Sequence, residues 1–263
     1  MSAREVDFGG ARRGWEEPAR WRPGLVDVVF VAALEREVSR AARGWTSTTL
    51  RVGRTERRMY YDMLERAALV CAGTGPERAY RAAKACIEEF SPRLLVSIGF
   101  AGSCGPELAP GAVIVPARVV VPAAGDESAP AKEFPCACGS GTLLSVNAVA
   151  SSAGKRQARA RYGAMALEME AAGVAAAAAE YGREFAAIKA ISDGVDEDLD
   201  FLSAFVTPDG FAMGRFLAFL AVRPGLWLQV AALDRNSRLA TRALEQAVVE
   251  CIGDWPAFAA RHS

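Results

Sequence analysis

The sequence predicts an α/β fold: a three-layer single domain with a mixed, partly parallel central sheet flanked by helices, plus a C-terminal helical extension. Two observations predict it. Short apolar runs, each the length of a strand buried on both faces, recur along the chain. Amphipathic stretches long enough for helices separate several of them, and this alternation is typical of a sheet with parallel members.

In the first half of the chain, the valine-rich run 25–34 predicts the first buried strand. The segments "TTLRVGR" and "RMYYDML" predict a hairpin, because a short charged turn joins two strand-like runs. The next strand breaks at Gly73, and the amphipathic helix that follows stops at Pro92. A further buried strand then leads into a glycine-rich loop, "GFAGSCG" (99–105).

In the second half, "GTLLSVNAVA" is a candidate strand, and a polar helix follows with Ser151 or Ser152 as its cap. "MALEME" predicts a strand that feeds an alanine helix over 170–181, and "EFAAIKAISD" predicts a final buried strand. Helices are expected over 211–222 and from about residue 226 to 252. We therefore expect a loosely ordered extension at 1–24, the α/β domain at 25–222 and a helical extension at 223–263.

Composition narrows the classes of function. The formal net charge is zero, which gives no bulk attraction to nucleic acid or to an anionic membrane. The longest apolar tract, Ala171–Ala179, is too short for an integral membrane span. The six cysteines lack the spacing of a redox or zinc motif, so we expect reduced thiols and a cytoplasmic protein.

One histidine count removes several mechanisms. The only histidine is His262, the next-to-last residue. Catalysis by Ser–His–Asp or Cys–His, and a histidine-ligated metal site, are therefore not expected. Acid–base work falls to carboxylates, lysine, tyrosine or cysteine, and we expect no metal and no organic cofactor.

Acidic residues follow several predicted strands. Glu168 and Glu170 flank Met169 in "LEMEAAG", where they either share one face of a strand or occupy the first turn of a helix, which favours acids. Asp193 ends the last strand, as a turn or cap residue or as an acid that donates a proton. Glu37 follows the first strand, at a solvated helix start or as a general base. Carboxyl ends of strands are where α/β sheets usually bind ligands.

The order of these motifs resembles the nucleoside phosphorylase and nucleosidase superfamily, which includes purine nucleoside phosphorylases and methylthioadenosine/S-adenosylhomocysteine nucleosidases. The resemblance covers roughly residues 26–222. Its most specific pieces are "LEMEAAGVAAAAAEYG" and "AIKAISDGVD". It implies an enzyme that cleaves the bond between a ribose and a purine.

The resemblance also implies roles for the acids. Glu170 would hold the ribose hydroxyls, and Met169 would pack against the sugar. From the strand pattern, we expect Glu168 to support them on the same face. Asp193 would protonate the departing purine at N7. The residues expected to line the site from its loops are Gly75, Gly99, Phe100, Ala101, Gly102 and Ser192.

The resemblance allows either water or phosphate as the group that attacks the sugar. In the hydrolytic branch a glutamate after the first strand activates water, a role that falls to Glu37. The phosphorolytic branch holds phosphate with arginine and serine side chains, yet here Ser97 and Phe100 stand where arginine and serine are common. Lys189 and Arg36 remain candidates for positioning phosphate or water. We favour a nucleosidase that uses water over a phosphorylase, with a non-catalytic nucleoside-binding module as a further alternative.

The C-terminal segment is longer than a minimal nucleosidase needs. It is similar to the long C-terminus of phosphorylase-like proteins associated with hopanoid lipid synthesis. The run "FLAFLAVRPGLWLQVAAL" is apolar enough to dock a lipid or membrane face, or to pack on the core or on a second subunit. Members of the superfamily are commonly dimers, trimers or hexamers, so a homo-oligomer with a small-molecule nucleoside substrate is expected.

Overall fold

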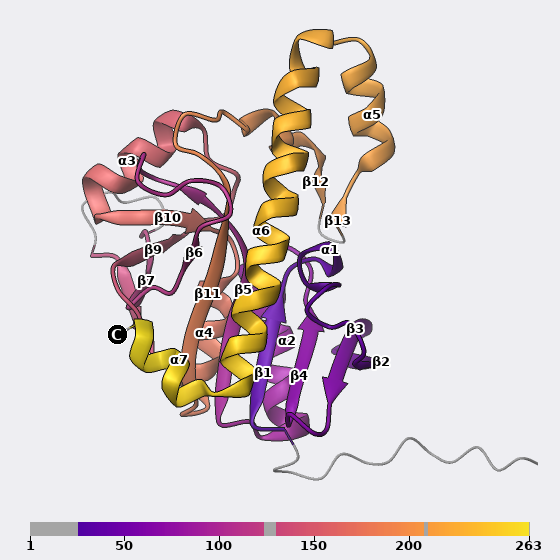
Figure 1. The fold of residues 1–263 in the computed structure, drawn as a ribbon, viewed down its shortest axis with the longest axis vertical. Helices are drawn as coiled ribbons and strands as arrows, with labels where there is room; N and C mark the ends of the chain where they lie inside the picture. The colour runs from indigo at the N-terminus through magenta and orange to yellow at the C-terminus, as the bar shows by residue number, and fades with distance from the viewer. Residues whose placement is uncertain (1–25, 124–129, 208–209, 263) are drawn as a thin grey trace, which may run out of the picture.

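The computed structural model describes residues 26–123, 130–207 and 210–262 (Figure 1). The extension expected at 1–24 lies outside the described residues. Within them, eleven strands form one sheet, whose main path runs in the order β2 (Thr46–Val52), β3 (Thr55–Asp62), β4 (Ala67–Cys71), β1 (Val28–Ala32), β5 (Leu94–Ser103), β10 (Ala164–Glu168), β9 (Thr142–Ser145), β7 (Arg118–Val121) and β8 (Lys132–Pro135).

A further strand, β11 (Glu184–Asp193), leaves this path and pairs with both β5 and β6 (Val113–Ile114). β1 is parallel to β4 and β5, and β11 is parallel to β5. The β2–β3 hairpin and the pair β7–β8 are antiparallel. The sheet is therefore mixed and partly parallel, as the sequence predicts.

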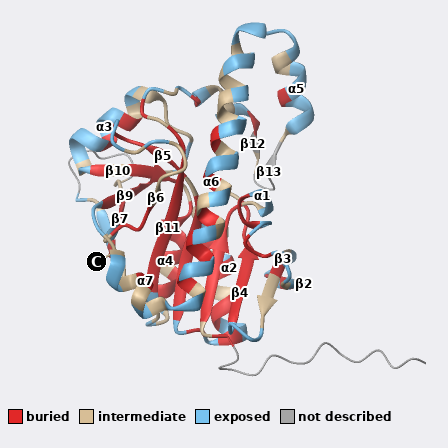
Figure 2. Cartoon of the chain, in the orientation of Figure 1, coloured by how far each residue is buried: buried red, intermediate tan, exposed pale blue. Residues whose placement is uncertain are grey.

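Helices cover both faces of the sheet, as Figure 1 shows. Val29 and Val31 of β1 belong to the core shared with α2 (Pro76–Phe90) and α4 (Ala171–Glu180). Their neighbours on the strand, including Phe30, belong to the core on the other face, which α6 (Trp227–Gly253) and α7 (Trp255–His262) cover. Because alternate residues of a strand point to opposite faces, β1 is buried on both sides, which accounts for its uninterrupted apolar run (Figure 2).

The alanine-rich sequence of α4 lets this helix approach α2 closely. A Cβ on Gly173 would lie 2.0 Å from the Pro76 carbonyl oxygen, so no larger residue fits at this crossing. The same close packing fixes the N-terminus of α4, and with it the end of β10, against the loop that begins α2.

Several short elements complete the fold. Ser151 caps α3 (Ser152–Tyr162) by accepting a hydrogen bond from the Gly154 amide at 3.2 Å. The remaining elements are α1 (Glu35–Val38), the 3₁₀ turns η1 (Asp200–Phe205) and η2 (Pro224–Leu226), the hairpin β12 (Val206–Thr207) and β13 (Gly210–Phe211), and α5 (Met213–Ala221).

The C-terminal helices divide into two parts. The second half of α6 packs on the sheet through Ala240, Leu244 and Val248. α5 and the first half of α6 project beyond the sheet in Figure 1. Large apolar side chains on this projection are exposed, among them Leu217 and Leu228. No single helix of the described residues is both long and apolar enough to cross a membrane, and α5 meets the test only together with 224–253, across a bend of 113°.

Two local expectations are wrong. The glycine-rich stretch 99–102 is not a loop: β5 continues through it, because its backbone stays paired with β11 up to Gly102. The strand expected in "MALEME" ends at Glu168, and Glu170 already stands at the N-cap of α4. The helix α7 was not predicted.

Candidate active site

The turn after β1 separates two glutamates that the sequence places side by side. Glu35 is exposed and accepts a hydrogen bond from the Tyr60 hydroxyl. Glu37 is buried, and its Oε2 accepts a hydrogen bond from the Leu34 amide at 3.2 Å. Burial raises the pKa of Glu37, because the ionised carboxylate has lost most of its water. Glu37 is therefore the glutamate of this turn that can take up a proton inside the molecule.

Glu168 connects β10 to the start of α4. Its carboxylate accepts hydrogen bonds from the Glu170 and Ala171 amides, each at 2.9 Å from Oε2. The same oxygen lies 2.9 Å from Nζ of Lys189, and both side chains are almost fully buried. Glu168 thus occupies the helix N-terminus that favours acids, and its charge is balanced by lysine. Met169 lies half-buried between the two glutamates.

Glu170 reaches across to the loop before α2. Its Oε1 accepts a hydrogen bond from the Gly75 amide at 2.9 Å. Gly75 has φ +98°, a conformation that L side chains rarely adopt, which explains a glycine at this turn. Burial, and secondly the charge of Glu168, raise the pKa of Glu170 to about 8.

Lys189 stands at the centre of these acids. Its Nζ donates to the Ser97 hydroxyl at 2.9 Å in addition to its ion pair with Glu168. A Cβ on Gly99 would lie 3.1 Å from Oε2 of Glu37 and 3.9 Å from Nζ of Lys189, so the glycine leaves room for both side chains. We call Glu37, Glu168, Glu170 and Lys189 the acid–lysine cluster. It joins the ends of β1 and β10 to the middle of β11.

Asp193 lies at the end of β11 and is also buried. The Ser192 hydroxyl donates to its Oδ1 at 2.6 Å, and Nζ of Lys155 lies 2.5 Å from its Oδ2. Lys155 comes from α3 and was not predicted, since its neighbours in "KRQARAR" are the charged residues of an exposed helix face. No pattern in the sequence distinguishes this lysine from them.

Apart from Arg36, the remaining predicted residues lie on the two central strands rather than in loops. Phe100 is half-buried beside the core on the α6 face, and Ala101 belongs to the core on the other face. Gly102 leaves room for the acid, since a Cβ there would lie 2.8 Å from Oδ2 of Asp193. Arg36 is exposed on α1. Ser192 is the residue whose hydroxyl donates a hydrogen bond to Asp193.

The register of β5 and β11 arranges the two parts of the site. Lys189 pairs with Gly99, and Asp193 pairs with Gly102. The register shifts between Ile191 and Asp193, so four residues of β11 lie opposite three of β5 between Lys189 and Asp193.

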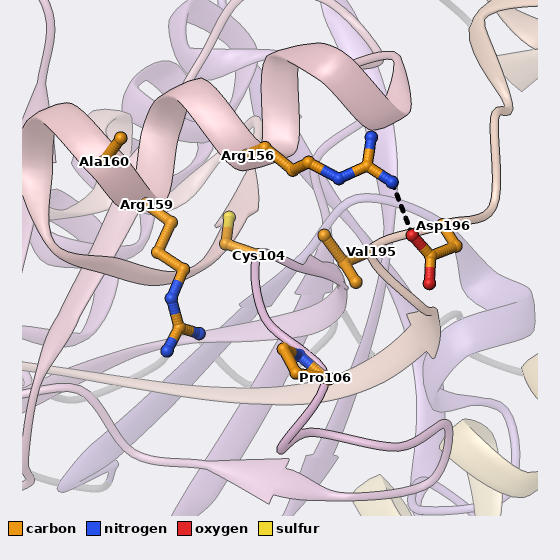
Figure 3. Close-up of a pocket in the computed structure, with 7 residues that line it drawn as sticks. All are labelled: Cys104, Pro106, Arg156, Arg159, Ala160, Val195 and Asp196. Atoms are coloured by element: carbon orange, nitrogen blue, oxygen red, sulfur yellow. Dashed lines mark hydrogen bonds and ion pairs between the residues drawn. The ribbon is translucent and has the colours of Figure 1, made fainter.

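A separate pocket lies beside α3 and the segment after β11 (Figure 3). Its two arginines are both paired, Arg156 with Asp196 and Arg159 with Glu107. None of the predicted site residues lines it; its residues are Cys104, Pro106, Arg156, Arg159, Ala160, Val195 and Asp196. Within the described part of the chain, no three histidine, cysteine or acidic side chains are arranged to hold a metal ion.

Three solved structures that superpose on this chain are named as nucleosidases or as a hydrolase. The 5′-methylthioadenosine/S-adenosylhomocysteine nucleosidase of Neisseria meningitidis superposes with a TM-score of 0.64 at 19% identity, over 87% of this chain and 98% of that one. The Arabidopsis thaliana 5′-methylthioadenosine nucleosidase gives 0.64 and 19% over 88% and 97%. The futalosine hydrolase of Helicobacter pylori gives 0.61 and 16% over 86% and 98%. These likenesses show the fold.

A search of curated proteins found no match. The family model described as the phosphorylase superfamily matches residues 27–131 and 123–208, which together exceed half of the chain. This chain therefore belongs to the phosphorylase superfamily.

Proposed function

We propose that this protein is a purine-nucleoside N-glycosidase that cleaves the ribosyl–purine bond with water. The observation that carries the proposal is the pairing of Lys189. Its ammonium is already bound to the Glu168 carboxylate and the Ser97 hydroxyl. A phosphate dianion needs several donors or cations, whereas this lysine is already engaged by an acid.

The same cluster suits the activation of water. Glu37 is buried, and burial raises its pKa above that of an ordinary glutamate, which makes it the stronger base. In the proposed reaction, water attacks C1′ of the ribose and Glu37 takes the proton that the water loses. The C1′–N9 bond breaks, its electron pair moves into the purine, and Asp193 protonates the purine at N7.

The sugar is held by Glu170, with Met169 packed against it. An ionised carboxylate can accept hydrogen bonds from two neighbouring hydroxyls at once. Because burial raises the pKa of Glu170 to about 8, the ligand-free acid is largely neutral at neutral pH. Hydroxyl donors favour its ionised form, so ribose binding should release a proton from this residue.

Product analysis tests the proposal. Purified protein is incubated with methylthioadenosine, adenosine and inosine, with and without phosphate, and the free base and the sugar product are quantified. We expect free base and unphosphorylated sugar without phosphate. Strict dependence on phosphate, with a sugar 1-phosphate as product, would identify a phosphorylase. Binding without any product would identify a nucleoside-binding module.

The acid assignment is tested with a matched pair of variants. Asp193→Asn should lower the rate on the order of 10²–10⁴-fold, because it removes the proton donor. Asp196→Asn, three residues further on, changes an acid that is exposed and paired with Arg156, and should leave the rate near that of the unmodified protein. Near-normal turnover by Asp193→Asn would refute its role as the acid.

A further inference from the structure

Lys155 is unusual because it is a buried lysine on a solvent-exposed helix. α3 is rich in charged residues, and its neighbouring Arg156 is exposed, yet Lys155 is only 1% exposed. Taking an ammonium out of water costs several kcal/mol, so such a position needs strong compensation. The compensation is local and complete.

All three N–H donors of the ammonium find acceptors. Nζ of Lys155 lies 2.5 Å from Oδ2 of Asp193, and 2.8 Å from the carbonyl oxygens of both Gly194 and Glu197. A lysine ammonium has three donors and no acceptor, so this set satisfies it fully. The lysine therefore ties α3 to the turn that follows β11, with Asp193 as its only charged partner among these three.

The carboxylate of Asp193 is fixed from two sides. Ser192 donates to Oδ1 at 2.6 Å and Lys155 to Oδ2. A Cβ on Gly102 would lie 2.8 Å from that Oδ2 and 3.2 Å from Cε of Lys155, so the glycine of β5 makes room for the pair. Each carboxylate oxygen keeps one further lone pair, available to a bound purine.

Resting on the proposed function, we propose that Lys155 is a positioning residue that holds Asp193 toward the leaving base and supplies the proton that Asp193 passes on. The C1′–N9 bond breaks and its electrons move into the purine; the Asp193 carboxylate takes a proton from the Lys155 ammonium and passes it to N7. The water oxygen bonds to C1′ and its proton goes to Glu37. Glu37 then releases a proton to solvent, and Lys155 takes one up.

The leaving group provides the test. A purine needs protonation to leave, whereas 4-nitrophenolate leaves without it. Lys155→Met and Lys155→Gln are compared with Arg156→Met, a change of the exposed neighbour on the same helix. Each protein is assayed on a purine nucleoside and on the 4-nitrophenyl riboside with the same 5-substituent, and kcat and KM are measured separately.

For both Lys155 variants we expect kcat on the nucleoside to fall about 10²–10³-fold, with KM little changed. Cleavage of the nitrophenyl riboside should stay within about threefold, and Arg156→Met should affect neither substrate. A structural role would slow both substrates by the same factor, which overturns the proposal, as does unchanged nucleoside cleavage. Lys155→Gln, which keeps N–H donors, provides the result if Lys155→Met does not fold. An unmodified protein that cleaves neither substrate refutes the proposed function itself.

Discussion

Replacing Glu170 by glutamine tests whether the fold keeps this side chain protonated at a pH at which an ordinary glutamate is ionised. Its pKa is 4.5 ordinarily and about 8 in the folded protein, chiefly because it is buried. The unfolded chain therefore releases this proton first as pH rises. The stability associated with the neutral acid is complete below pH 4.5 and is lost progressively as pH rises toward about 8.

The size of the effect follows from this difference in pKa. One pKa unit corresponds to about 1.4 kcal/mol, so between about pH 5 and about pH 7 this group alone lowers the free energy of unfolding by about 2 kcal/mol. Glutamine has the same shape and no charge to lose. The difference in free energy of unfolding between Glu170→Gln and the unmodified protein should therefore shift by about 2 kcal/mol in favour of the variant between pH 5 and pH 7.

Urea denaturation at the two pH values, followed by fluorescence, measures the difference. The control is Glu89→Gln, which changes an exposed glutamate of α2. A stability difference for Glu170→Gln that stays constant with pH, like that of the control, would refute the raised pKa. Because the variant also loses a charged acceptor for ribose, cleavage should fall about 10–100-fold under the proposed function.

Three further predictions concern the neighbouring residues. In steady-state kinetics, Glu37→Gln should lower kcat about 10²–10⁴-fold with KM little changed. Normal turnover by this variant would contradict the role of Glu37 as base. Gly102→Ala should lower activity at least about 10-fold, because the new Cβ meets a carboxylate oxygen at 2.8 Å; Gly214→Ala, with open space around it, serves as control. Lys189→Met should destabilise the fold by about 3–5 kcal/mol, since it leaves a carboxylate buried and unpaired. In urea denaturation, the double variant Lys189→Met/Glu168→Gln should recover part of this lost stability. Stability losses that simply add would show that the two residues are not coupled.

Part of the site could be predicted from where its residues follow the predicted strands. Apolar runs placed β1, β5 and β11 in a sheet with parallel members, and the residues after such strands collect at one edge. On that basis Glu37, Glu170 and Asp193 were expected together. The structure places Glu37 and Glu170 around Lys189, with Asp193 four residues further along β11.

Other features depend on tertiary contacts that local sequence does not encode. Gly99 and Gly102 predict a loop by composition, but pairing with β11 keeps them extended, and their missing side chains leave room for buried acids. Glu168 looks equivalent to Glu170 in sequence, yet it accepts the first amides of α4. Lys155 resembles any exposed charged residue until the turn after β11 packs against it.

The pairing of β5 with β11 has a consequence for how the molecule opens. The register joins Leu94 to Glu184, about 90 residues apart in the chain, so the polar residues come together only once a distant contact has formed. The central strands of a buried sheet belong to the most protected unit of a protein. Amide hydrogens of β5 and β11 should thus exchange only on global unfolding. Under the proposed function, access of a nucleoside then depends on motion of peripheral segments, while the strand pair that carries Lys189 and Asp193 stays rigid.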